Sequence, residues 1–252
     1  MSLFQRFLDA NHALCRLLDR VWPYPLGATF WVRYEDLCAD CAAKAEPARV
    51  VDVGAGRMTP YATRLSLASV EVIGVDILSE DLEANQELTV RIKRDIATQG
   101  MPEEAGNAGL ITSRMVLEHI PDQDRFAAEL FRSLASDGRI VHLFAARYSL
   151  FATLNRLLPE GTSQKVLFRL RPESADIGGF ETFYDRTHAL AAEEVFRRAG
   201  FVDVETAISY QVSQYFHFFF PLFVVARLWE TMLHALGLKN LGSFVLLSAR
   251  RP

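Results

Sequence analysis

One segment constrains the fold of this chain more than any other, the run RVVDVGAG at residues 49–56. Its β-branched first half is typical of a strand buried in a parallel sheet, and its glycines predict a sharp turn directly after the strand. Glycine has no Cβ, so the backbone amides of such a turn can approach a ligand closely. We therefore expect a ligand-binding loop at Gly54–Gly56, followed by a helix that begins near Thr59.

Predicted strands and helices alternate after this loop. The strands are expected at residues 70–76, 89–95, 108–114, 139–146, 201–209 and 242–250, and the helices at residues 78–85, 124–136 and 187–200. Such alternation favours an α/β fold with helices on both faces of the sheet. We expect a three-layer, Rossmann-like architecture, mostly parallel, with an antiparallel C-terminal strand and an N-terminal helical extension.

The chain is expected to form a single domain over residues 1–252, since its length and its 50% hydrophobic content suit one globular core. Within it we distinguish four parts by sequence pattern. They are an N-terminal helical cap at 1–45, a cofactor-binding core at 46–146, an insertion that would cover the acceptor at 147–187, and C-terminal helices and strands at 188–252.

Charge and cysteine content narrow the class of protein. The formal net charge is −4, so there is no overall basic surface and no nucleic-acid partner is expected. Cys38 and Cys41 have the spacing of half a zinc site, but no second pair follows; we interpret them as helix thiols and expect no metal. Sparse cysteines and the lack of a secretory signal at the N-terminus favour a cytoplasmic location.

A second acidic residue accompanies the glycine turn. Asp76 closes the predicted strand at 70–76, 22 positions after Gly54 (76 − 54). An acid at the end of the second strand can accept both ribose hydroxyls of a nucleoside. The dinucleotide fingerprint needs a third glycine where Thr59 stands, so a nucleoside other than a dinucleotide is favoured.

At this point the sequence resembles the class I S-adenosylmethionine-dependent methyltransferases. The matching motifs are VVDVGAG, GVD, KRDIAT and SRMVLEHIPDQDRFAAELFRSLASDGRIV, and YDRTHALAAEEVFRRAGFVDVE extends the match. The chain departs from the family at Met58, where a third glycine is frequent. The resemblance implies S-adenosylmethionine as the cofactor and methyl transfer as the activity.

The resemblance also implies a set of cofactor-binding residues. They are Asp52, Gly54, Ala55, Gly56, Asp76, Ile77, Asp95, Ile96, Ser113 and Arg114. The first acid and the glycines would line the methionine part, Asp76 would hold the ribose, and Asp95 with Ile96 would flank the adenine. Ser113 and Arg114, at the end of the fourth strand, would face the reactive sulfonium.

Two residues are candidates for the chemistry on the acceptor. His119, after Glu118, would lie near the carboxyl edge of the sheet and could act as a general base, although LEHIPD also occurs in the family without that role. Tyr184, with Arg186, could shape the acceptor pocket. His142 falls inside a predicted strand, where packing in the core is the simpler interpretation.

The segment at residues 215–237, YFHFFFPLFVVARLWETMLHALG, is strongly apolar, but Pro221, Arg227 and Glu230 interrupt it. It could be a core helix or a homodimer surface, or else a lid or an interfacial helix that contacts lipid. The N-terminal helix is also amphipathic. We therefore expect a small-molecule, sugar or lipid-linked glycan as acceptor, methylated on oxygen or nitrogen, with a peripheral membrane contact as one alternative.

Two rival functions remain open from the sequence. One is a non-catalytic subunit that keeps the fold and uses the apolar segment as a protein interface. The other is an NAD(P)-dependent oxidoreductase, which the missing glycine at Thr59 disfavours.

Overall fold

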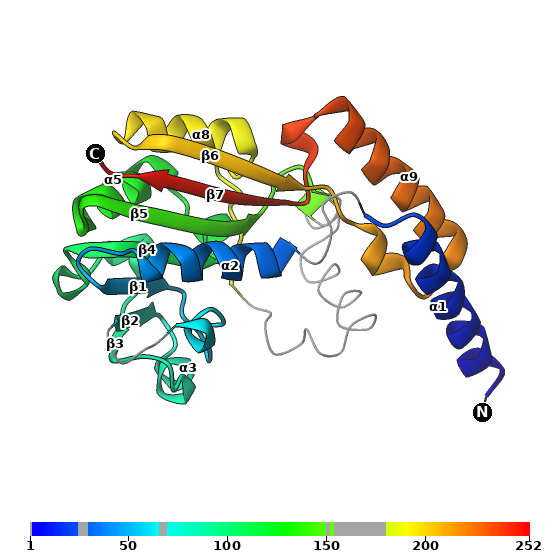
Figure 1. Ribbon diagram of the computed structural model, residues 1–252, viewed down its shortest axis with the longest axis horizontal. Coiled ribbons are helices and arrows are strands. Elements are labelled where there is room, and N and C mark those ends of the chain that lie inside the picture. The colour runs from blue at the N-terminus through cyan, green and yellow to red at the C-terminus, as the bar shows by residue number, and fades with distance from the viewer. Residues whose placement is uncertain (1, 25–29, 66–69, 150–151, 154–179) are drawn as a thin grey trace.

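The computed structural model describes residues 2–24, 30–65, 70–149, 152–153 and 180–252. Seven strands form one sheet in the order β3-β2-β1-β4-β5-β7-β6 (Figure 1). Their bounds are β1 Arg49–Val53, β2 Glu71–Asp76, β3 Val90–Lys93, β4 Ala108–Arg114, β5 Leu134–Ala145, β6 Val202–Ser209 and β7 Phe244–Arg250. The first five strands pair in parallel, and β7 is antiparallel to both of its neighbours. The predicted fold class is confirmed.

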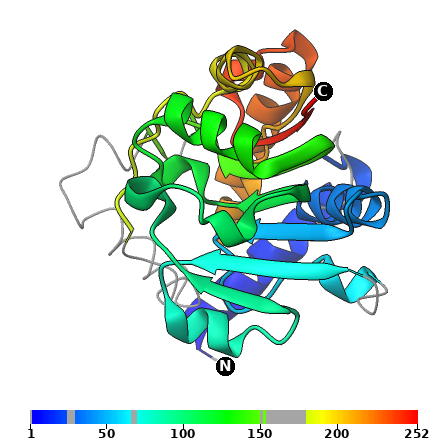
Figure 2. The same ribbon diagram turned by 90° about the vertical axis from the view of Figure 1, so that its left-hand side faces the viewer.

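Helices cover both faces of the sheet. Their bounds are α1 Leu3–Val21, α2 Phe30–Ala43, α3 Ser79–Ala84, α4 Ile96–Gln99, α5 Gln123–Ser133, α8 Ala189–Arg198 and α9 Phe220–Leu236. Figure 2 shows α2 on one side of the sheet and α5 on the other. The helix α2 carries both Cys38 and Cys41, and it packs Tyr34 and Cys38 against the strands.

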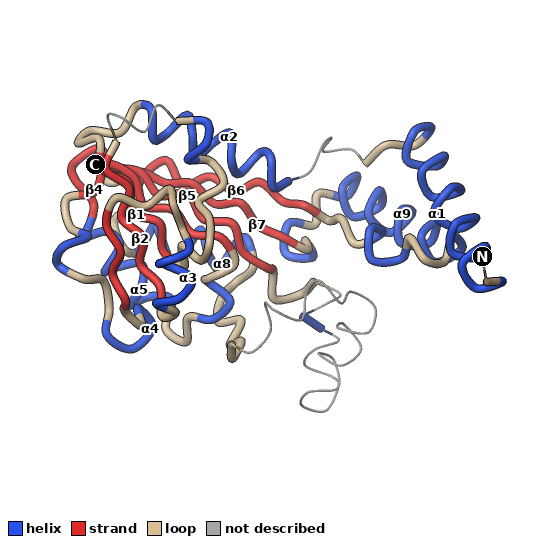
Figure 3. Tube along the Cα trace, turned by 90° about the horizontal axis from the view of Figure 1, so that it is seen from below, coloured by secondary structure: helices blue, strands red, loops and turns tan. Residues whose placement is uncertain are grey.

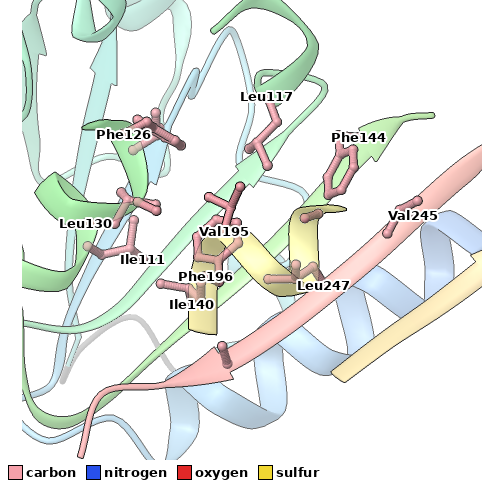
Figure 4. Close-up of a cluster of buried hydrophobic side chains, with 14 of the residues drawn as sticks. Ile111, Leu117, Phe126, Leu130, Ile140, Phe144, Val195, Phe196, Val245 and Leu247 are labelled. Atoms are coloured by element: carbon pink, nitrogen blue, oxygen red, sulfur yellow. The ribbon is translucent and has the colours of Figure 1, made fainter. Parts of the chain in front are cut away.

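The main core lies between the sheet and the helices α5 and α8. Phe126 and Leu130 of α5 and Phe196 of α8 point toward strand residues such as Ile111 (Figure 4). Each helix begins at a residue whose side chain accepts a backbone N–H bond, Asp122 for α5 and His188 for α8. Such caps satisfy amides that have no partner inside the helix, and they fix where each helix starts.

The helix expected near Thr59 is not an α-helix in the part of the chain that the structure describes. The amide of Ala62 instead bonds to the carbonyl of Thr59 at 2.9 Å, which closes a turn, and a short 3₁₀ helix follows at Ala62–Arg64. The Thr59 side chain is held inward by a bond to Asp52. The helix predicted near Thr59 is therefore a short 3₁₀ helix that begins three residues later.

The two helices α1 and α9 pack together and project beyond the carboxyl end of the parallel strands (Figures 1 and 3). The chain reaches α9 from the end of β6 and returns from it into β7. We call these two helices the α1–α9 helix pair. None of the described helices combines the length and the apolar character that crossing a membrane requires.

Candidate cofactor and acceptor site

The glycine turn after β1 is held against β2. The amide of Gly54 donates to the carbonyl of Val75 at 2.8 Å, and both Gly54 and Gly56 have positive φ, at 69° and 53°. A Cβ on Gly54 would lie 2.4 Å from Val116 Cγ2, whereas a Cβ on Gly56 would meet nothing within 4 Å. The turn therefore presents open backbone at Gly56, and the small side chain of Ala55 is buried beneath it.

The side chain of Asp76 lies at the rim of this turn. Its Oδ2 accepts from the amide of Gly56 at 3.0 Å, and its Oδ1 accepts from the amide of Leu78 at 2.9 Å. The residue is half-buried, and the adjacent Ile77 is exposed. A carboxylate offers about four acceptor positions, so Asp76 retains capacity for two hydroxyl donors while it shapes the loop.

Asp52 is buried below the turn and supports it from inside. Its two oxygens accept from the hydroxyls of Thr59 at 2.9 Å and Thr112 at 3.0 Å. Burial raises the pKa of the Asp52 carboxyl to about 6. Its position fixes the loop from below, because Thr59 lies at the far end of the turn.

Asn85 also holds the loop, and the sequence patterns did not single it out. Its side-chain amide is fully buried and donates to the carbonyls of Ala55 and Gly56 and to the hydroxyl of Thr59, at 3.2–3.3 Å. The guanidinium of Arg91 in turn donates to the Asn85 carbonyl at 2.6 Å. An asparagine after a short helix carries no signal of this role, because the contact depends on the strands lying side by side.

Asp95 and Ile96 follow β3 along the same edge. The carboxylate of Asp95 caps α4, accepting from the amide of Ala97 at 3.0 Å and the hydroxyl of Thr98 at 2.7 Å. Ile96 is half-buried and packs against the main core. The structure thus gives Asp95 a structural role, in addition to its place at the carboxyl edge of the sheet.

Ser113 and Arg114 end β4 and point to opposite faces of it. The Ser113 hydroxyl is fully buried and lies 2.7 Å from Nδ1 of His142, which itself stacks on Phe196. Its side chain faces the α5–α8 core and not the turn, which corrects the expectation that it would face the cofactor. Arg114 lies on the other face, with its guanidinium 5.9 Å from the centre of the Trp31 ring.

His142 is the packed core histidine that its place in a strand predicts. It is fully buried between Phe126 and Phe196, and burial lowers its pKa to about 3. A neutral imidazole in this position contributes packing surface and one bond to Ser113.

Glu118 is a buried acid at the carboxyl edge. The side chain is 2% exposed, and Oε1 accepts from the Ala145 amide at 3.5 Å. Within the described residues, Oε2 has no hydrogen-bond partner. Burial raises the pKa of the Glu118 carboxyl to about 7, so this acid is poised to titrate near neutral pH.

His119 is half-buried beside Glu118. Its Nδ1 lies 2.7 Å from the carbonyl oxygen of Glu181, and its ring packs edge-on against Phe180. A carbonyl oxygen only accepts, so the bond requires the proton on Nδ1 and leaves the lone pair on Nε2. Burial lowers the pKa of His119, which favours the neutral imidazole that a general base needs.

Tyr184 is joined to the same edge through backbone bonds. The amides of Phe183 and Tyr184 donate to the carbonyl of Glu118 at 2.9 and 3.1 Å, and the Tyr184 carbonyl accepts from Arg147 at 2.8 Å. Its ring is buried against Ala145. Tyr184 therefore forms a wall beside Glu118 at the carboxyl edge of the sheet. Its backbone has a positive φ of 50°, a strained conformation of the kind found at functional sites.

Arg186 points away from this wall toward α5, where it pairs with Asp124. The predicted acceptor cover at 147–187 lies largely outside the described residues, which resume at Phe180. The site residues that the structure brings together are thus the Gly54–Gly56 turn, Asp52 and Asp76 on one side and Glu118, His119 and Tyr184 on the other, all at the carboxyl ends of strands.

Comparisons with known proteins agree with this geometry. The family model for a methyltransferase domain matches residues 9–206, more than half of the chain. No curated protein sequence matches the chain. Among solved structures, a proposed sarcosine dimethylglycine methyltransferase from Galdieria sulphuraria aligns with a TM-score of 0.51 at 14% identity, over 95% of this chain and 98% of that one.

A second similar structure is phosphoethanolamine N-methyltransferase 2 of Haemonchus contortus. It aligns with a TM-score of 0.51 at 15% identity, over 100% of this chain and 61% of that chain. At such identities the structural likeness shows the fold alone. The family match, the strand order and the acids at the ends of β1 and β2 together establish that this chain belongs to the class I S-adenosylmethionine-dependent methyltransferases.

Proposed function

We propose that this protein transfers a methyl group from S-adenosylmethionine to an oxygen or nitrogen of a small-molecule, sugar or lipid-linked acceptor. The observation that supports it best is the Gly54–Gly56 turn with Asp76 at its rim. The turn leaves open space at Gly56, and the half-buried carboxylate of Asp76 keeps acceptor positions for ribose hydroxyls. The described residues thus fit the cofactor, which when bound supplies an activated methyl group on a sulfonium.

The chain's own residues would position the two reactants. Asp76 and Ile77 would hold the ribose, Asp95 and Ile96 would border the adenine, and Asp52 would keep the turn in shape from below. Tyr184, buried against Ala145, would wall the acceptor side and exclude water.

His119 would act as the base for a hydroxyl acceptor. The support is its tautomer, which places the lone pair on Nε2, and its lowered pKa, which keeps the imidazole neutral at neutral pH. Replacement with Gln should lower kcat for a hydroxyl acceptor by about 100-fold or more while the affinity for cofactor is unchanged. An unchanged kcat together with an unchanged pH–rate profile would assign His119 a packing role only.

Titration calorimetry tests the cofactor. Wild type should bind S-adenosylmethionine and S-adenosylhomocysteine, and Asp76→Ala should weaken both by about tenfold or more, because bonds to a charged acceptor contribute more than neutral ones. Asp40→Ala is the matched control: it removes an exposed carboxylate from the interior of helix α2, where alanine is well tolerated. Unfolding midpoints of both variants should be compared, since Asp76 also bonds to the loop.

The same titration includes NADH. The sheet order disfavours an oxidoreductase, because antiparallel β7 separates β5 from β6, whereas dinucleotide-binding folds place a parallel strand there. Binding of NADH without binding of either sulfur nucleoside would overturn the proposal. If wild type bound none of the three, the non-catalytic subunit would replace it.

A further inference from the structure

The helix α9 is built with its charges inside and its apolar side chains outside. Its two charged residues, Arg227 and Glu230, are 1% and 0% exposed. Its outward face consists of large apolar side chains that are 43–62% exposed: Leu222, Val225, Leu228, Trp229, Met232 and Leu236. A water-exposed helix ordinarily has the opposite arrangement, so this face is suited to a non-aqueous neighbour.

A network of buried bonds holds α9 in this orientation. The Arg227 guanidinium donates to Asp19 of α1 at 2.6 Å and to the carbonyl of Trp22 at 2.8 Å, and it pairs with Glu230 at 3.0 Å. The Glu230 carboxylate also accepts from the amides of Val212 and Ser213. Rotating the helix to bury its apolar face would break these bonds and place the two charges in water, so the exposure is fixed by the fold.

The partner helix α1 carries a second exposed apolar stripe. Its members are 46–85% exposed: Leu3, Phe4, Phe7, Leu14, Leu17 and Val21. The exposed cations Arg6, Arg16 and Arg20 lie on the same helix. Its two acids are Asp9 and Asp19, and Asp19 is already paired with Arg227. The exposed charge on α1 is therefore predominantly positive.

We propose that the α1–α9 helix pair docks on the surface of a membrane that contains anionic lipids. The apolar faces of α9 and α1 enter the boundary between headgroups and acyl chains, and the three arginines of α1 meet lipid phosphates. Trp229, in the middle of the α9 face, has the amphipathic ring that favours this boundary. The complementarity between arginines and anionic headgroups favours lipid over a second copy of the chain, whose own α1–α9 helix pair carries the same positive charge.

The α1–α9 helix pair lies beyond the carboxyl end of the sheet (Figure 1), so a membrane that binds it would lie nearer to that end of the sheet than to the opposite end. An acceptor held in the lipid would then lie on the same side of the molecule as His119 and Tyr184. The docking proposal does not depend on methyl transfer, because binding to vesicles is measured without cofactor or acceptor.

Vesicle co-sedimentation tests the proposal with the full-length chain. Wild type should sediment with vesicles of phosphatidylcholine mixed with phosphatidylglycerol and much less with phosphatidylcholine alone. Val225→Glu combined with Trp229→Glu should reduce the partition coefficient by about 100-fold, since two apolar side chains no longer leave water. Arg16→Gln with Arg20→Gln should reduce binding to the anionic vesicles alone, by about tenfold.

Val202→Glu is the control for an added glutamate, because it replaces an exposed valine at the start of β6, at the opposite end of the sheet. It should leave vesicle binding unchanged. Wild type that stays in solution with both kinds of vesicle would overturn the proposal. A stable dimer by light scattering, which the α9 double substitution converts to monomer without any vesicle binding, would overturn it in favour of a homodimer surface.

Discussion

The helices α8 and α9 have opposite relations to water. In α8 the apolar residues Val195 and Phe196 are buried against the sheet, and the arginines of its last turn are exposed. In α9 the charged pair is buried and the apolar residues are exposed. The difference teaches that an amphipathic pattern predicts a helix with two faces but does not say which face is inside. In α9 that choice is made by the partners of Arg227, and one of them lies about two hundred residues away in α1.

The two regions also treat a buried acid differently. In the α1–α9 helix pair, the Glu230 carboxylate forms an ion pair with Arg227 and accepts three hydrogen bonds from Val212 and Ser213. At the carboxyl edge of the sheet, Glu118 has one long bond to the Ala145 amide, and its second oxygen has no partner in the described part of the chain. A satisfied acid serves structure, whereas an unsatisfied one at the carboxyl edge of a parallel sheet is a feature of functional sites.

Breaking the buried ion pair between Arg227 and Glu230 should have the largest effect on the free energy of unfolding. Arg227→Met leaves Glu230 buried without its cation and should lower the free energy of unfolding by about 3 kcal/mol or more. The figure is toward the lower end for a buried pair, because Asp19 is partly exposed and water can replace its partner. Urea unfolding followed by tryptophan fluorescence measures the loss.

The control for this change is the addition of Glu230→Gln, which removes the stranded charge while keeping a side-chain oxygen for the amides of Val212 and Ser213. The double variant should recover part of the lost stability. No loss in Arg227→Met would mean that the network does not fix the orientation of α9, and it would weaken the contrast with α8.

The strands, the glycine turn and the acids at 52 and 76 could be predicted because their signals are local. A β-branched run, a pair of glycines and an acid at the end of the next strand each occupy a few adjacent residues. The support of the turn by Asn85 and the inward face of Ser113 could not be predicted, because both depend on which strands lie side by side. The same is true of the helix expected at Thr59, where a tertiary bond to Asp52 replaced the local preference.

The sequence predicted an amphipathic N-terminal helix and a strongly apolar segment at residues 215–237, but it left open whether the apolar residues of either would be buried. Leu3 and Val21 recur at helical spacing and yet are 85% and 71% exposed. The spacing of apolar residues predicts a helix with an apolar face, but only the tertiary structure shows whether other parts of the chain bury that face.

An intermediate effect is expected from the unsatisfied acid. The pKa of Glu118 is about 7 in the folded protein against 4.5 for the ordinary residue, so the folded state holds a proton that the unfolded state has lost between these values. Stability therefore falls as pH rises from about 4.5 to about 7, by roughly 3 kcal/mol in total. Glu118→Gln should flatten this dependence and be more stable than wild type at pH 8.

Unfolding midpoints in urea at several pH values measure this effect. Asp52 also has a raised pKa, to about 6, so some pH dependence will persist in Glu118→Gln. The quantity to compare is the difference between the two proteins at each pH. A constant difference from pH 4 to pH 8 would show that Glu118 does not titrate in this range.

The smallest effect is expected on the exposed face of α9, and it is the most direct test of the comparison between the two helices. Val225→Ser changes a residue that is 62% exposed and should alter the free energy of unfolding by less than about 0.5 kcal/mol. The same substitution at Val195 in α8, 1% exposed, should cost about 2–3 kcal/mol, because it both leaves a gap and buries a hydroxyl. The two variants share their chemistry and their helical setting, so only burial distinguishes them. Equal losses would mean that the α9 face is covered in solution by protein, and the apolar surface available for lipid would not exist.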